Sequence, residues 1–110
     1  MIHSTAIISK KAKIHKNVKI GPFCIIDDNV EIQEGTELIS NVHLGGNTSI
    51  GFNNVFFPFS TIGLIPQDKK FKGEKSELII GDNNIFREHV TINPGTKYGG
   101  MKTIIKNNCL

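Results

Sequence analysis

The side chains best suited to chemistry in this sequence are its histidines, its cysteines and one polar cluster. The histidines are His3, His15, His43 and His89, and the cysteines are Cys24 and Cys109. A catalytic zinc site requires several such ligands converging on one ion, typically three His, and these histidines share no spacing that predicts it. The cysteines have no metal-ligand spacing and are too few for a disulfide scaffold. We therefore expect two reduced thiols and surface or turn roles for the histidines, with His43 in a corner and His89 at a turn.

The polar cluster is Gln67, Asp68 and Lys70, which follow Pro66 within the charged stretch 63–79. An unpaired carboxylate is costly to bury, so we expect this stretch to lie outside the core. A second stretch rich in Gly and Pro begins at Pro94. The sequence thus predicts external loops near 64–78 and 94–102. Loops on rigid scaffolds tend to carry function, and these two are the candidate sites.

The scaffold is predicted by a six-residue period of large apolar side chains. They occupy Ile2, Ile8, Ile14, Ile20, Ile26, Ile32, Leu38, Leu44, Ile50, Phe56 and Ile62. Asp68 and Glu74 break the period, and it returns with Ile80, Phe86, Ile92, Tyr98, Ile104 and Leu110. Self-similarity at a fixed period is typical of a solenoid.

Two further columns define the repeat. The position two before each large residue is mostly small or β-branched, as at Ala6, Ala12, Val18, Cys24, Val30, Thr36, Val42, Thr48, Ser60 and Val90. The position three after it holds Asn or Gly at Asn17, Asn29, Gly35, Asn41, Asn47, Asn53, Asn83, Gly95 and Asn107. Residues two apart in a strand face the same side, and Asn and Gly tolerate a positive φ. Each hexad therefore reads as a short strand and a corner. Three hexads close a triangular coil, so that Ile2, Ile20, Leu38 and Phe56 stack.

Composition and charge narrow the class of protein. The chain has 18 Ile against 2 Ala, which favours an all-β fold over a helical bundle. A meander or sandwich of strands would have less regular spacing of its turns. The net charge is only +3, and clustered lysines are followed by clustered acids, so we expect no nucleic-acid partner. No apolar run reaches the roughly 20 residues of a membrane span, and the first residues do not resemble a signal peptide. We expect a cytoplasmic protein.

The run from Thr61 to Phe71, Thr-Ile-Gly-Leu-Ile-Pro-Gln-Asp-Lys-Lys-Phe, resembles the UDP-N-acetylglucosamine O-acyltransferases of lipid A biosynthesis. Further matching blocks are Ile20-Gly21-Pro22-Phe23, the stretch 80–88 and the stretch 90–96. The order and separation of these blocks also fit, and the resemblance covers all 110 residues. It implies a single-stranded left-handed parallel β-helix built of hexapeptide repeats.

The resemblance also implies an activity. Members of this family are homotrimers with active sites between subunits. They transfer a 3-hydroxyacyl chain from acyl carrier protein to the 3-hydroxyl of UDP-N-acetylglucosamine, the first step of lipid A biosynthesis. A neutral His acts as general base and backbone N–H groups stabilise the oxyanion. No metal or redox cofactor is implied. A mildly basic protein suits the acidic carrier protein as a partner.

Site residues carry over individually from the resemblance. Asp68 and Lys70 match positions that contact the nucleotide sugar, and Gln67 lies beside them. Asn93 matches a position where some members have a substrate-contacting His, and its amide can hydrogen-bond but cannot titrate near neutrality. The family's catalytic His follows a strand that begins near Asn108, and its C-terminal coils and helical domain are not represented. We therefore expect an N-terminal portion without turnover of its own.

Two alternatives remain open at this point. One is another enzyme on the same scaffold, such as a carbonic anhydrase of the hexapeptide class, which would need a zinc site. The other is a non-catalytic β-helix scaffold that folds or pairs through an exposed coil.

Overall fold

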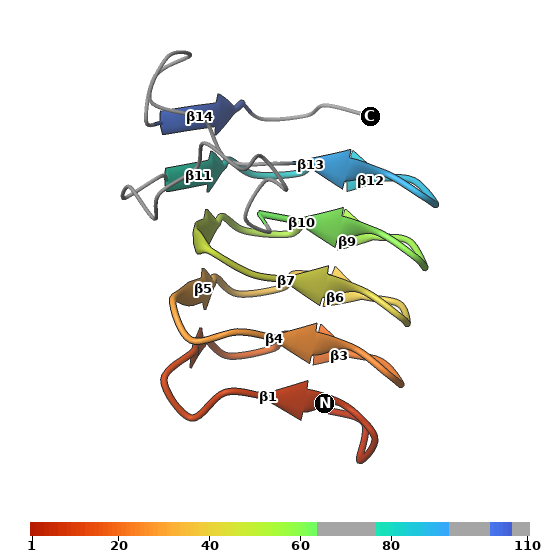
Figure 1. Cartoon of the computed structure of the whole chain (residues 1–110). Coiled ribbons are helices and arrows are strands. Elements are labelled where there is room, and N and C mark those ends of the chain that lie inside the picture. The colour runs from red at the N-terminus through yellow and green to blue at the C-terminus, as the bar shows by residue number, and fades with distance from the viewer. Residues whose placement is uncertain (64–76, 93–101, 107–110) are drawn as a thin grey trace, which may run out of the picture.

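The chain winds into a three-sided helix of parallel strands, with each coil adding one strand to each of three sheets (Figure 1). The computed structural model describes residues 1–63, 77–92 and 102–106. The described residues contain no helix long and apolar enough to cross a bilayer. The coils stack from the N-terminal β1 at one end to β14 at the other (Figure 1).

The three sheets are built from strands that recur every third element. The first sheet, in the order β1-β4-β7-β10-β13, contains β1 (Ile7–Ile8), β4 (Ile25–Ile26), β7 (His43–Leu44), β10 (Thr61–Ile62) and β13 (Thr91–Ile92). The second, in the order β14-β11-β8-β5-β2, contains β2 (Lys13–Ile14), β5 (Val30–Ile32), β8 (Asn47–Ile50), β11 (Glu77–Ile80) and β14 (Lys102–Ile105). The third, in the order β12-β9-β6-β3, contains β3 (Lys19–Ile20), β6 (Glu37–Leu38), β9 (Val55–Phe56) and β12 (Ile85–Phe86).

Strand pairing confirms the predicted stacking of residues 18 apart. Ile20 is the partner of Leu38, and Leu38 is the partner of Phe56. A bridge from Ile2 to Ile20 begins the same ladder. All of the pairings are parallel. The predicted fold class, an all-β parallel β-helix of hexapeptide repeats, is therefore confirmed.

The interior of the prism is filled by the large apolar column. Its members from Ile20 to Ile62 are all buried, and so are Leu78, Ile80 and Phe86. Phe56 and Phe86 stack with ring centroids 4.6 Å apart. Because two-residue strands bury little on their own, contacts between successive coils supply most of the stability.

Corners are closed mainly by residues with a positive φ, as predicted for the Asn and Gly column. Asn17, Asn41, Asn53, Asn83 and Gly35 take this conformation, as does His89. Two members of the column, Asn29 and Asn47, do not. Two others are aromatic residues, Phe23 (φ 59°) and Phe59 (φ 66°), at which a left-handed conformation is strained.

Two of the coils contain additional residues. Ile80 pairs with Ile50, thirty residues earlier, so this coil holds twelve residues more than the usual 18. Ile105, not Ile104, is the partner of Ile80, which adds seven residues to the next coil. The predicted phase of Ile104 is therefore wrong by one position, because the second addition is not a multiple of six. The added lengths fall around 64–76 and 93–101, which lie outside the described residues.

A hydrogen-bonded polar ladder occupies the small interior column. Thr36, Asn54 and Asn84 are fully buried. The Thr36 hydroxyl donates to the carbonyl of Gly51 and accepts from the backbone N–H of Asn54. The Asn54 side chain in turn accepts from the N–H of Asn84 at 2.8 Å. The hexad pattern did not predict the two asparagines, because it expected a small or β-branched residue in this column.

Replacement of Thr36 by Val tests this ladder, because the substitution keeps the shape and removes the hydroxyl. It leaves the partly buried Gly51 carbonyl and the buried Asn54 N–H without that partner, which should lower the free energy of unfolding by about 1–3 kcal/mol. Thr91→Val is the matched control, since Thr91 is exposed, and its effect should stay within about 0.5 kcal/mol. Urea unfolding followed by circular dichroism measures both. Equal stability of the two variants would contradict a structural role for the Thr36 hydroxyl.

Candidate functional site

The predicted site residues lie outside the described part of the chain. Gln67, Asp68 and Lys70 fall within 64–76, and Asn93 opens the stretch 93–101. The described residues that bear on them are those at which the two stretches leave the helix and return to it. These exit and return points determine where the candidate residues can be.

Both stretches leave from the same edge of the prism. We call this edge, which follows strands β1, β4, β7, β10 and β13, the loop corner. Ile62 of β10 is the partner of Ile92 of β13, and the Gly63 N–H donates to the Ile92 carbonyl at 2.6 Å. The return points are also paired, since Glu77 lies opposite Lys102. The stretches containing Asp68 and Asn93 therefore begin one directly above the other.

Glycines allow close backbone contact where the first stretch leaves. Gly63 has a φ of +77°, and a Cβ there would lie 2.2 Å from Thr48 Oγ1 and 2.4 Å from the Gly45 carbonyl oxygen. Gly46, with a φ of +66°, approaches the Gly63 carbonyl in the same way. The Thr48 hydroxyl donates to the Gly45 carbonyl at 2.6 Å. The exit point is thus held by packing that only glycine fits.

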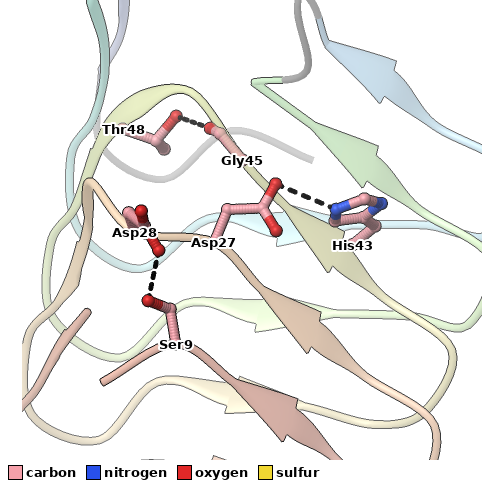
Figure 2. A network of polar contacts seen from close by, with 6 residues as sticks. All are labelled: Ser9, Asp27, Asp28, His43, Gly45 and Thr48. Carbon is pink, nitrogen blue, oxygen red and sulfur yellow. Dashed lines mark hydrogen bonds and ion pairs between the residues drawn. The ribbon is translucent and has the colours of Figure 1, made fainter. Parts of the chain in front are cut away.

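Polar side chains cross-link successive coils along the loop corner (Figure 2). Ser9, after β1, donates its hydroxyl to Asp28, after β4. The adjacent Asp27 accepts from His43 Nε2 of β7 at 3.1 Å. Asp27, Asp28, Asn29 and Gly46 line a shallow pocket at this corner. The corner therefore presents carboxylates two coils below the exit of the stretch 64–76.

These contacts do not form a nucleophile and base pair. The Ser9 hydroxyl donates to a carboxylate, so no imidazole activates it in the arrangement described. His43 is paired with Asp27. Among the described residues, these contacts serve hydrogen bonding and positioning.

The histidines take surface roles, with one correction. His43 was expected in a corner but lies in strand β7, where its side chain faces outward and pairs with Asp27. The six-residue period does not show whether position 43 belongs to the corner or to the start of the next strand. His15 pairs with Glu31 at 2.8 Å, and the His3 ring lies 2.9 Å from the Thr5 hydroxyl. His89 takes the predicted turn conformation. Among the described residues, no three His, Cys, Asp or Glu side chains group as metal ligands.

Cys24 is a core residue without reactive character. It is completely buried, and burial raises the pKa of its thiol. A thiol with a raised pKa carries little thiolate at neutral pH and is a poor nucleophile. Cys109 lies outside the described residues.

An apolar surface covers the outer face of the first sheet and the corner before it. Ile7 and Ile25 are partners on this face, and Ile7 is 66% exposed. Phe23 and Phe59 are 62% and 58% exposed. A shallow pocket here is lined by Phe23, Ile25, Asn41, Val42, His43, Phe59, Ser60 and Thr61. We call this surface the aromatic face. Sequence inspection missed it, although large aromatic residues in the Asn and Gly column were the available signal.

The comparisons with known proteins agree on one family. A family model described as bacterial transferase hexapeptide (six repeats) matches residues 5–40. The acyl-[acyl-carrier-protein]–UDP-N-acetylglucosamine O-acyltransferase of Thermodesulfovibrio yellowstonii is 55% identical over 104 residues, which are 94% of this chain and 40% of the relative. The protein of the same name from Rickettsia typhi is 50% identical over 99% of this chain and 41% of the relative. The chain thus spans about two fifths of the length of these relatives.

Solved structures give the same result. A UDP-N-acetylglucosamine acyltransferase from Bacteroides fragilis has a TM-score of 0.93 at 48% identity, covering 100% of this chain and 43% of the other. The enzyme from Francisella novicida has a TM-score of 0.92, also at 48% identity, covering 98% and 40%. The backbone described above is therefore shared with these enzymes.

Replacement of Gly63 by Ala tests the exit point of the first stretch. The new methyl group would meet a backbone carbonyl in addition to adopting a strained φ, so we expect a loss of about 2–4 kcal/mol in the free energy of unfolding. Gly35→Ala is the control: its φ is +78°, but the methyl group would meet only the end of the Asn53 side chain, which can move. That variant should lose about 1 kcal/mol. If the two variants unfold at the same denaturant concentration, the backbone contact at the loop corner is unimportant.

Proposed function

We propose that this chain, a homologue of the N-terminal part of the acyl-[acyl-carrier-protein]–UDP-N-acetylglucosamine O-acyltransferases, carries the sugar-nucleotide-binding segment of such an enzyme. The reaction is transfer of a 3-hydroxyacyl group from acyl carrier protein to the 3-hydroxyl of UDP-N-acetylglucosamine, at the start of lipid A biosynthesis. The observation that carries the proposal is 50% identity over 99% of the chain, which includes both candidate segments.

The roles of individual residues follow from the matching positions. Asp68 and Lys70 would bind the nucleotide sugar, with Gln67 beside them and Asn93 contributing an amide. A lysine suits a diphosphate as a point charge, and a carboxylate accepts hydrogen bonds from sugar hydroxyls. The paired exits at Ile62 and Ile92 support this grouping, because they start both segments at neighbouring points of the loop corner.

The general base is proposed to come from elsewhere in the enzyme. His15 and His43 are each occupied by a carboxylate, and the His89 ring stacks on Phe59 with centroids 5.6 Å apart. His3 follows Ile2, which pairs with Ile20 of β3, and Figure 1 shows β3 well below β10 and β13. We place the base outside this chain on the family resemblance, in which the catalytic His follows a strand that begins near Asn108.

A second copy of the chain is the proposed partner for the aromatic face, in a homotrimer. Its exposed Phe and Ile side chains are unusual for a surface in contact with water. Phe23 and Phe59 also hold strained conformations, which are kept where they serve a purpose. Burial against another subunit would stabilise both. Acyl carrier protein is the second proposed partner, as the acyl donor.

A chimera tests the activity. Residues 1–110 replace the corresponding part of the Thermodesulfovibrio yellowstonii relative, and acylation of UDP-N-acetylglucosamine is followed with purified acyl carrier protein. We expect turnover by the chimera. Asp68→Asn and Lys70→Ala should each lower kcat/KM about 10–100-fold, since each removes a charge-assisted hydrogen bond of about 1.5–3 kcal/mol.

Neighbouring lysines supply the matched controls for this experiment. Lys69→Ala and Lys72→Ala change the charge of the same segment and should stay within about twofold of the chimera. A folded chimera of native oligomeric state that transfers no acyl group would count against the proposed function. Unchanged kinetics in both Asp68 and Lys70 variants would count against the site alone.

The subunit interface has its own test. Phe59→Glu places a charge in the aromatic face and should shift the chimera from trimer to monomer in sedimentation velocity, because burial of an unpaired charge is strongly unfavourable. Phe52→Glu is the control, since Phe52 is 44% exposed but lies outside the aromatic face. A trimeric Phe59→Glu variant would exclude this surface as the interface.

A further inference from the structure

Thr48 is a buried polar residue between apolar neighbours. It lies in β8 and is only 1% exposed. Its strand partners are Val30 on the coil before it and Leu78 on the coil after it, and both are buried. A valine side chain has the shape to fill the same space, so packing alone does not explain the hydroxyl. Because a buried hydroxyl is costly unless it is hydrogen-bonded, its partners indicate what it does.

The Thr48 hydroxyl lies beneath the point at which the stretch 64–76 leaves the helix. It donates to the Gly45 carbonyl at 2.6 Å (Figure 2). Gly63 lies against both groups, since a Cβ there would be 2.2 Å from Thr48 Oγ1 and 2.4 Å from the Gly45 carbonyl oxygen. The Gly45 N–H also donates to the Ile62 carbonyl at 2.9 Å. The hydroxyl therefore orients the carbonyl against which the last residue before the stretch packs.

The backbone of Thr48 holds the point at which the same stretch returns. Strand β11 begins at Glu77, and its second residue, Leu78, is the strand partner of Thr48. Glu77 itself pairs with Asn47. One residue thus contacts the exit through its side chain and the return through its strand pairing. The spacing between the two ends of 64–76 therefore depends on Thr48.

A similar hydroxyl closes a corner that has no added residues. Ser60 donates to the Phe57 carbonyl at 2.7 Å. The strands on either side of that corner, β9 and β10, pair with β12 and β13 at the same sequence offset of thirty residues, so the coil above gains nothing there. Closing a corner is thus a general use of such a bond. Thr48 differs because its corner carries the added stretch.

We propose that Thr48 is a positioning residue for the segment that contains Asp68 and Lys70. Its hydroxyl holds the start of the segment through the Gly45 carbonyl, and its backbone holds the end through Leu78. The consequence for ligand binding rests on the proposed function, because it requires that Asp68 and Lys70 bind the nucleotide sugar. The consequence for the two ends requires no activity.

Amide hydrogen exchange in the 110-residue chain tests the positioning itself. Thr48→Val and its matched control Thr36→Val each remove one buried hydroxyl that donates to a carbonyl. We expect Thr48→Val to speed exchange of the Gly63 N–H about tenfold relative to the Glu37 N–H, because exchange reports local opening. Thr36→Val should have the opposite preference, since Glu37 adjoins it and donates to the Asn54 carbonyl.

The serine variant separates the hydroxyl from the rest of the side chain. Thr48→Ser keeps the donor, so its Gly63 exchange should stay within about threefold of the unsubstituted chain. Thr48→Ser and Thr48→Ala differ only in the hydroxyl. If Thr48→Val does not fold, the comparison of these two variants replaces it, with faster exchange expected in Thr48→Ala.

Kinetics of the chimera test the consequence for binding. Thr48→Val should raise the KM for UDP-N-acetylglucosamine about five- to tenfold and leave kcat within about twofold, because a displaced segment weakens binding of that substrate. The KM for the acyl carrier protein substrate should not change. Thr36→Val should change neither KM, although it destabilises the fold. Thr48→Ser should stay within about twofold of the chimera in all three constants.

The outcomes separate this proposal from the proposed function. Gly63 exchange that Thr48→Val does not speed, or that Thr36→Val speeds equally, would overturn it. An unchanged KM for UDP-N-acetylglucosamine in Thr48→Val would also overturn it where the Asp68 and Lys70 variants bind this substrate more weakly. A chimera without turnover would count against the proposed function, and the exchange rates would still decide the role of Thr48.

Discussion

The hydrogen bond from one coil to the next is the interaction on which the rest of the structure depends. The N–H of Ile25, for example, donates to the carbonyl of Val42 at 2.9 Å, and the same step recurs from coil to coil. Strands of two residues cannot persist alone. These strands form because each one pairs with a strand of an adjacent coil. The pairing also sets which side chains stack on one another. This stacking aligns the apolar ladders, the polar ladder and the corners from one coil to the next.

The same stacking positions the candidate site. Coils can take up twelve and seven additional residues and still pair in parallel at Ile80 and Ile105. The register is restored because the interior ladder offers only one way to bury these side chains. As a result, the two variable stretches start from paired residues and return to paired residues. Each of these stretches is therefore joined to scaffold contacts at both of its ends.

The sequence was sufficient to predict the ladders, the corners and the fold class, because a fixed period has a single geometric interpretation. It was insufficient where the physical cause lies in neighbouring coils. Asn54 and Asn84 break the small-residue column, yet the Asn54 side chain donates to the Gly81 carbonyl and accepts from the Asn84 N–H, both on the next coil. The left-handed conformation of Phe23 follows from its place in the stack and not from its side chain. Asp68 and the other proposed site residues rest on family resemblance, since period and burial do not assign their roles.

The glycine contact at Gly63 has a consequence for how such proteins diversify. The close contacts of Gly63 and its hydrogen bond to the Ile92 carbonyl are both made before the added residues begin. The packing of the prism therefore does not depend on the sequence that follows Gly63. The loop corner is thus a position at which additional residues of different number and composition can be inserted without repacking the prism. The sequence of the added residues can therefore change in evolution while the packing of the prism stays the same.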